Sequence, residues 1–454
     1  MISKANLNKH VRSTRTYKFK VRTSFALQSK FEQLQDVQRL YFNYSLKYMY
    51  QHYGIGHLYI WPSTPQYLVK NCKAFARAKA LTHGFSLKDM DINIQATDKM
   101  LEQLWANFDT YRKGQRQARH WSDETRDKYL REHVCNITGY GRIKYKHDAE
   151  DIRSVTLKKN SNRIFLHNTY SIELPCFKTV KTYKSMNNIL HKDIQEARIV
   201  HRPNGNFELQ VVVKFENIKQ LSRRDSDNIV GLDVNMKDNK FFALSTGKTL
   251  TWTKHVAHQY AMLDSKSRRL NKEIRKHNKG RDNSIALAKL NKQNAKIKDR
   301  MSHIIDNWQL QVAKQLSAEH NVLAIEQLNS FDLRMSKRYN QRFRKNVNNK
   351  LAKIQPTSFR TIMECVYQND GHLLLEVNSI DTSKTCNNCG YINHGLTIKE
   401  RQWQCPECDA ILNRDLNATY NIRDWAIDVN KHAVLKQQPD RFKYLKKSDL
   451  VKVY

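Results

Sequence analysis

The amino-acid sequence predicts an α/β protein with an added all-β barrel and a helical insertion. Three observations lead to this fold class. Apolar residues recur every three or four positions over long segments, which is typical of amphipathic helices. Short runs rich in Val, Ile and Phe, separated by Asn, Pro and Gly, fill residues 154–215 and indicate a small sheet or barrel. Beyond residue 228, strand-like and helix-like segments alternate as in a layered α/β domain.

A large excess of positive charge distinguishes the composition. Lys and Arg number 79 against 43 Asp and Glu, which leaves a formal net charge of +36. A compact protein with this charge repels itself unless an anionic partner lies against it, so we expect nucleic acid as the partner. A basic membrane-surface protein is the alternative, but no run approaches the ~18 apolar residues of a spanning helix. We therefore expect no membrane partner.

The length and the N-terminal stretch bear on domain number and location. A chain of 454 residues exceeds one simple core and indicates about two to four units. The first residues are basic and lack the apolar segment of a secretory signal. We expect an intracellular protein, in the cytoplasm or nucleoid if the host is a prokaryote.

The expected order of elements follows from local patterns. Residues 15–26 alternate as in a strand, and residues 28–53 and 89–112 carry apolar side chains at helical spacing. The polar segment Leu221–Asn228 predicts a linker and a domain boundary. Beyond it we expect strands over residues 229–251, a helical hairpin over 264–300 with a corner near Gly280, a helix over 302–320, a strand ending near Glu326, a helix over 357–368, a strand over 372–380 and a helix beginning near Arg414.

Two strongly basic segments lie in the second half of the chain. Asp264–Arg300 holds 13 Lys and Arg against four acidic residues. A charge run is usually a solvated helix face, but this imbalance of sign favours a surface that faces phosphates. Arg334–Lys353 has eight basic residues, no acidic one and little apolar periodicity. We expect this second segment to be mobile without nucleic acid.

Four cysteines form two pairs at metal-ligand spacing. Cys386 and Cys389 are separated by two residues, and so are Cys405 and Cys408, with fifteen residues between the pairs. Four thiolates in two such turns form a closed tetrahedral shell, which is typical of structural Zn²⁺ and leaves no position for a catalytic water. Iron is the less common alternative. The other four cysteines are scattered, which argues against a disulfide framework; they are Cys72, Cys135, Cys176 and Cys365.

Three acidic residues are candidates for catalysis. Asp233 lies in VGLDVN, Glu326 in LAIEQL and Asp415 in LNRDLN. Each alone is read most simply as a strand terminus or an acid in the first turn of a helix. Together they match the strand, strand and helix carboxylates with which a ribonuclease H-like sheet holds Mg²⁺ against a phosphodiester.

With these motifs in order, the chain resembles the TnpB family of transposon-encoded RNA-guided nucleases, which is related to the compact type V CRISPR effectors. The residues that carry the resemblance are VGLDVNMKDNKFFALSTG, LAIEQLN, TSKTCNNCG and WQCPECDAILNRDLNATYNI. The chain departs from the family at Asn235, Gln327 and Asn413, none of which is one of the three acids.

The resemblance implies an RNase H-like (RuvC) nuclease domain that carries a four-cysteine zinc ribbon. It makes Asp233, Glu326 and Asp415 the catalytic acids that bind two Mg²⁺ ions, with Mn²⁺ as a substitute. It makes the four paired cysteines the Zn²⁺ ligands, so that the ribbon would fix the helix that bears Asp415. The implied activity is RNA-guided cleavage of double-stranded DNA next to a short motif, with a guide RNA as partner.

The resemblance also implies a division into domains: a wedge-like β-barrel over residues 1–27 and 147–224, a helical recognition insertion over 28–146, the RuvC domain over 225–380 and 410–430, the zinc ribbon over 381–409 and a basic tail over 431–454. We expect the tail to be solvated or disordered. Two other functions stay open at this point. One is a nuclease-silent RNA-guided DNA-binding regulator, and the other is a transposase that joins strands with a similar acid trio.

Overall fold

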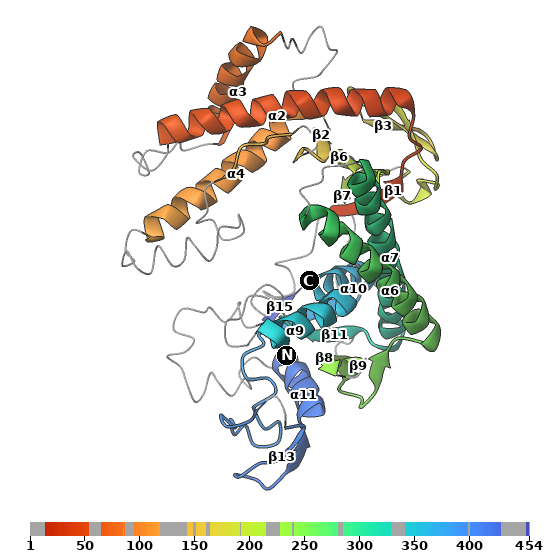
Figure 1. Ribbon diagram of the computed structural model, residues 1–454. Helices are drawn as coiled ribbons and strands as arrows, with labels where there is room; N and C mark the ends of the chain where they lie inside the picture. The colour runs from red at the N-terminus through yellow and green to blue at the C-terminus, as the bar shows by residue number, and fades with distance from the viewer. Residues whose placement is uncertain are drawn as a thin grey trace. The chain divides into compact units, whose positions relative to one another are not determined.

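The structure is a computed structural model of the chain, shown in Figure 1. It describes residues 14–53, 65–84, 86, 95–118, 143–148, 151–159, 164–190, 192–214, 228–237, 240–279, 285–327, 341–397, 400–427 and 451–453. The chain divides into two compact units, an N-terminal unit, Thr14–Phe215, and a C-terminal unit that contains Glu216–Tyr454. Most of the expected linker, residues 221–227, lies outside the described residues. No helix in the described ranges combines the length and apolar character needed to cross a bilayer.

Two small antiparallel sheets share one core in the N-terminal unit. Alternating burial along the strands, as in FELQVVVK, shows that the period-two pattern predicted from the sequence is present. An isolated bridge between Val21 and Thr182 joins the sheets, and Leu209 and Ile172 from the two sheets lie in the same apolar cluster. The first sheet has the order β1 (Thr14–Lys20), β7 (Phe207–Lys214), β6 (Ile194–His201), β2 (Ser154–Lys158), and the second the order β3 (Phe165–Asn168), β4 (Ser171–Leu174), β5 (Lys178–Lys181).

Three helices complete this unit: α2 (Phe25–Tyr53), α3 (Pro65–Thr82) and α4 (Gln95–Ala118). The first half of α2 packs on the core of the sheets through residues such as Phe31, and its second half packs on α4 through residues such as Leu46. Helix α3 was not predicted from the sequence. The expected start of α4 at residue 89 lies outside the described residues.

A six-stranded mixed sheet forms the centre of the C-terminal unit. Its order is β10 (Thr249–Thr251), β9 (Lys240–Leu244), β8 (Ile229–Lys237), β11 (Val322–Glu326), β12 (Leu373–Val377) and β15 (Val451–Val453). Strands β8, β11 and β12 are parallel, whereas β9 and β10 form an antiparallel meander at one edge. Strand β15 pairs antiparallel with β12 at the other edge. The expectation of a solvated or disordered tail is therefore wrong for these three residues. Their backbone pairs with β12, which would otherwise be an unpaired edge strand.

Helices cover both faces of this sheet. On one face, α7 (Ile285–Glu319) and α10 (Pro356–Asp370) form a core in which the Phe242 ring stacks on Trp308 and Phe359, with centroids 5.8 and 4.0 Å away. On the other face, α11 (Arg414–Ile427) packs against β11 and β12 through Ile422 and Trp425. This three-layer arrangement is that of the α/β domain predicted from the sequence. Most of the basic segment Arg334–Lys353, which we expected to be mobile, forms helix α9 (Gln341–Ile354).

The basic segment forms a helical hairpin, in which α6 (Lys254–Lys279) lies beside α7 (Figure 1). The corner predicted at Gly280 lies outside the described residues. The separate helix predicted over residues 302–320 is wrong, because α7 runs unbroken through it. Three buried or half-buried polar side chains join the two helices: Ser267 donates to the side-chain oxygen of Asn294 at 2.8 Å, and Asn294 donates to that of Asn271 at 2.9 Å.

Candidate active site and metal centre

Strand register places Asp233 and Glu326 on the same face of the central sheet. Strands β8 and β11 are parallel neighbours, and Leu232 lies opposite Ile325, so the two acids follow at adjacent positions. Side chains alternate along a strand, and Leu232 and Ile325 both point into the core under α7 and α10. The two acids therefore face α11. Strand β8 continues past Asp233 to Lys237, so the acid does not end the strand as expected.

A glycine allows α11 to approach this face closely. Gly231 lies two residues before Asp233 and faces the same side of the sheet. A Cβ added at Gly231 would lie 2.1 Å from the carbonyl oxygen of Thr419 and 2.9 Å from the backbone nitrogen of Arg423. No side chain fits at that distance, so the backbone of α11 lies directly on β8. Asp415, one helical turn before Thr419, is brought toward Asp233 by this contact.

The start of α11 positions Asp415. Asn413, the last residue of β14 (Ile411–Asn413), caps the helix by accepting hydrogen bonds from the backbone nitrogens of Asp415 and Leu416, both at 3.1 Å. The Asp415 carboxylate accepts a hydrogen bond from the Arg401 guanidinium at 2.8 Å. The departure from the family at Asn413 thus supplies a helix cap.

The three acids are electrostatically coupled. Burial is the main cause that raises the pKa of Asp233 to about 6 and that of Glu326 to about 8. Repulsion adds to it, from Asp415 on Asp233 and from Asp233 on Glu326. The side-chain interaction between the two acids lowers the pKa of Asp233 and raises that of Glu326. Burial and mutual repulsion thus favour the protonated forms of Asp233 and Glu326.

These carboxyl groups suit a hard divalent cation. Mg²⁺ prefers oxygen ligands, and its charge would favour the ionised carboxylates and relieve the repulsion among the acids. The carboxylate oxygens of the three acids are not all as close together as the ligands of a single ion. Within the described residues, the four paired cysteines are the only group of three or more His, Cys, Asp or Glu whose ligand atoms all lie within 4.8 Å of one another.

Two arginines belong to the site and were missed in the sequence. Arg401 binds Asp415 directly, and Arg414 lowers the pKa of both Asp233 and Glu326 by its charge. Arg414 precedes Asp415, so a search for cations beside the acids would have found it. Arg401 lies fourteen residues before Asp415 and reaches it only because β13 (Gln402–Gln404) pairs with β14.

The paired cysteines lie in two turns of the same geometry. In the first turn, Gly390 donates its backbone N–H to the Cys386 carbonyl at 2.9 Å, and in the second Asp409 does the same to Cys405 at 2.9 Å. Gly390 and Asp409 both have a positive φ, of 84° and 57°. Such repeated turns are typical of zinc ribbons, in which each turn supplies two sulfurs.

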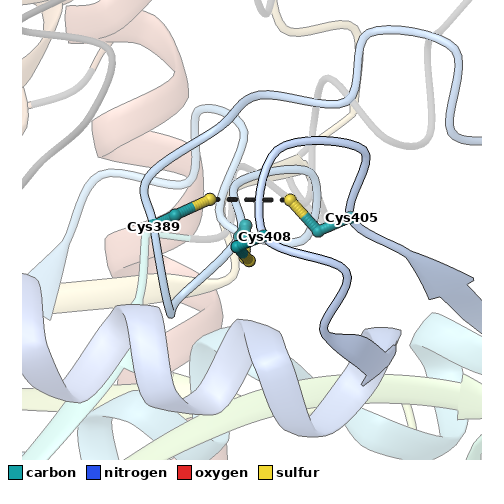
Figure 2. Close-up of side chains that lie close together, drawn as sticks. Cys389, Cys405 and Cys408 are labelled. Atoms are coloured by element: carbon teal, nitrogen blue, oxygen red, sulfur yellow. Dashed lines mark hydrogen bonds between the residues drawn. The ribbon is translucent and has the colours of Figure 1, made fainter.

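The sulfur atoms are spaced for a tetrahedral ion. The Cys386 and Cys408 sulfurs are 3.7 Å apart and those of Cys389 and Cys405 3.5 Å, and Figure 2 shows Cys389 and Cys405 pointing toward each other. A tetrahedron with Zn–S bonds of about 2.3 Å has edges of about 3.8 Å, whereas a disulfide needs about 2.0 Å. The side-chain amide of Asn388 donates to Cys408 and lowers the pKa of this thiol to about 6. The residues therefore fit Zn²⁺, and the four cysteines come together as predicted.

The comparisons with known proteins bear on this part of the chain. Residues 357–422 match the family model described as "Cas12f1-like, TNB domain". This range contains α10, the cysteine turns and the start of α11 with Asp415. No curated protein sequence matches the chain.

Solved structures extend the likeness to the fold of the whole chain. A cryo-EM structure of a Cas12f1-sgRNA-target DNA complex is 14% identical with a TM-score of 0.53, covering 90% of this chain and 98% of that chain. The mini-RNA-guided endonuclease Cas_phi3 (11% identical, 91% and 92% covered) and CasPhi-2 bound to crRNA and DNA (10% identical, 91% of each covered) give TM-scores of 0.42 and 0.39. The match to the Cas12f1 structure confirms the resemblance to compact type V effectors as a likeness of fold, while membership of the TnpB family stays a prediction.

Proposed function

We propose that the chain is an RNA-guided DNA endonuclease with one RuvC-type site formed by Asp233, Glu326 and Asp415. The observation that carries the proposal is the placement of Asp233 and Glu326 at adjacent positions of neighbouring parallel strands, under the helix that bears Asp415, with raised and coupled pKa values. Neighbouring acids whose pKa values are raised by burial and mutual repulsion are typical of functional sites rather than of solvated strand ends. The match of residues 357–422 to the Cas12f1-like TNB domain supports the same function.

In this proposal the three carboxylates hold Mg²⁺, or Mn²⁺ in its place. A pair of such ions would lower the pKa of a bound water and stabilise the leaving oxygen of a phosphodiester. The chain itself needs no side-chain nucleophile. Asp233 is central, because it is coupled to both of the other acids, whereas Glu326 and Asp415 flank it. Arg401 holds the Asp415 carboxylate by a hydrogen bond, and the charge of Arg414 favours the ionised forms of Asp233 and Glu326.

The proposed partners are a guide RNA and double-stranded target DNA, and the excess of 36 positive charges supports polyanionic partners. Base pairing with the guide would read the target, next to a short motif that the protein reads. The N-terminal unit would supply the wedge-like barrel and the helical recognition insertion, and the C-terminal unit the RuvC domain with its zinc ribbon. An intracellular location follows from these partners.

The test is cleavage of a plasmid by protein purified with the RNA transcribed from its native flanking DNA. Wild-type protein with Mg²⁺ should linearise a plasmid that carries the matching sequence. Asp233→Asn should lose at least about 1,000-fold in rate while keeping RNA binding, because cleavage needs the ions and binding does not. Glu32→Gln, an exposed acid of α2, is the matched control and should cleave as wild type.

Other outcomes identify the alternatives. Specific binding of the matching plasmid without cleavage would contradict the proposal and identify a regulator. Products in which the cut ends are joined to new DNA would identify a transposase. Sequencing of the RNA that remains bound during purification tests the guide directly, and a mixture without a dominant species contradicts an RNA-guided function.

A further inference from the structure

The turn that leads into the zinc ribbon contacts the candidate active site. Residues 379–385, here called the entry turn, connect β12 to the first zinc turn. Thr382 in this turn is 3% exposed, and its hydroxyl donates a hydrogen bond to the Glu326 carboxylate at 2.9 Å. The entry turn therefore holds one oxygen of an acid that lies on a different strand.

Two buried amides of α11 hold the entry turn in place. Asn421 donates to the carbonyl oxygens of Thr382 and Thr385, at 2.8 and 2.7 Å, and Asn417 donates to that of Thr385 at 2.6 Å. The two asparagines are four residues apart and so lie on one face of the helix. Both are no more than 2% exposed. Buried amides that lose their partners are costly, so the helix and the entry turn keep a single relative arrangement.

The same asparagines also bind the first zinc turn. Asn387, which follows the ligand Cys386, donates its backbone N–H to the Asn417 side chain at 2.9 Å. Its side-chain amide donates to Asn421 at 3.2 Å and to Asp424 at 3.0 Å. A continuous series of hydrogen bonds thus runs from the zinc turn through Asn421 and Thr382 to Glu326.

We infer that Thr382 is a positioning residue for Glu326 and that Asn421 couples it to the zinc turn. The ribbon then orients two acids, Glu326 through the entry turn and Asp415 through the start of α11. This inference deepens the proposed function and rests on it, because a metal-binding role of Glu326 gives the contact its purpose. Thr382 does not touch the reacting atoms; its hydroxyl limits the Glu326 carboxylate to one orientation before a cation binds.

The experiment compares Thr382→Val, which removes only the hydroxyl, with Thr382→Ser, which keeps it. Thr361→Val is the matched control, because that hydroxyl bonds to the backbone of its own helix. Zinc-loaded full-length variants are titrated with Mn²⁺ and followed by electron paramagnetic resonance. The binding that disappears in Asp233→Asn defines the acid site. Zinc content and thermal unfolding are measured on the same samples.

We expect Thr382→Val to keep its zinc and to weaken Mn²⁺ binding at the acid site about 10- to 100-fold, the value of a hydrogen bond to a charged group. Thr382→Ser should restore most of the affinity, and Thr361→Val should match wild type. Wild-type Mn²⁺ affinity in Thr382→Val would overturn the inference, as would loss of its zinc or the absence of Mn²⁺ binding in the wild-type protein.

The binding measurement uses neither RNA nor DNA, so the two proposals fail separately. Weakened binding in Thr382→Val from a protein that never cuts DNA would support the positioning role and contradict the nuclease. Cleavage and Mn²⁺ binding at wild-type level in Thr382→Val would support the nuclease and overturn the positioning role.

Discussion

Gly231 of the central sheet and Thr419 of α11 are in close contact: a methyl group on the glycine would lie 2.1 Å from the Thr419 carbonyl oxygen. We expect Gly231→Ala to shift α11 away from β8 and to separate Asp415 from Asp233. Cleavage should fall at least about 10-fold, and the free energy of unfolding by about 1–3 kcal/mol, as for other overpacked sites.

Gly395→Ala is the control for this substitution, because the nearest atom to its new Cβ would be 3.5 Å away. It should cleave at the wild-type rate. Wild-type cleavage by Gly231→Ala would show that the position of α11 does not limit catalysis.

Removal of the zinc ion should abolish cleavage without removing any of the three acids. We expect Cys405→Ser, which replaces a buried ligand, to lose zinc and to lose activity, because the start of α11 is then no longer held by the ribbon. Cys365→Ser, a change at a cysteine of α10 outside the zinc turns, should keep both. Metal analysis and plasmid cleavage on the same samples test this, and full activity in a zinc-free variant would refute the role of the ribbon.

Loss of Arg401 should reduce the rate of cleavage more than loss of a cation that does not contact the three acids. The Arg401→Ala variant loses the hydrogen bond to Asp415, and we expect cleavage to fall about 3- to 10-fold, a modest loss because the pair is partly exposed to solvent. Lys248→Ala breaks an exposed ion pair with Glu319 and should have no effect. Single-turnover rates at saturating Mg²⁺ separate the two, and equal rates for both variants would contradict a role of Arg401.

The stability of the metal-free protein should depend on pH through Glu326. Burial raises its pKa from 4.5 to about 8, so between these values the folded state binds a proton that the unfolded state releases. Stability in magnesium-free buffer should therefore fall as pH rises through this window. Added Mg²⁺ should raise the unfolding temperature more at pH 8.5 than at pH 6. Equal shifts at both pH values, measured by thermal denaturation, would contradict the raised pKa.

The helical hairpin should bind nucleic acid through an exposed row on α6. Arg269, Lys272 and Lys276 are exposed and lie at spacings of three and four residues. Their replacement by Glu should weaken RNA and DNA binding and reduce the slope of log K against log salt by about 2–3, since each phosphate contact contributes ~0.7–0.9.

Glu273→Lys, which adds a cation beside this row, should have the opposite effect and strengthen binding. An unchanged salt slope in the triple variant would show that the row is only a solvated helix face.

The features that could be predicted from sequence are those set by local pattern. Short apolar runs identified the strands that carry Asp233 and Glu326, and the cysteine spacing identified the ribbon, because both signals lie in neighbouring residues. A helix beginning near Arg414, with Asp415 as an acid in its first turn, was also predicted, and α11 begins at Arg414.

The features that were missed depend on contacts between distant segments. Arg401 reaches Asp415 across a hairpin, and Thr382 reaches Glu326 from another strand, so neither has a signature in its own stretch of sequence. The pairing of Val451–Val453 with β12 is equally non-local. The continuity of α7 was missed because its polar first half and its apolar second half differ in composition.

The polar seam of the helical hairpin has a mechanical consequence. Amides that are satisfied in one alignment only, such as Asn294 against Ser267 and Asn271, prevent the two helices from sliding past each other. Helix α7 ends at Glu319, three residues before the strand that ends in Glu326. We therefore expect the hairpin to move as one rigid element, about 50 Å long at 1.5 Å per residue. A polyanion bound at one end would then act on the other end, which is joined to the strand that carries Glu326.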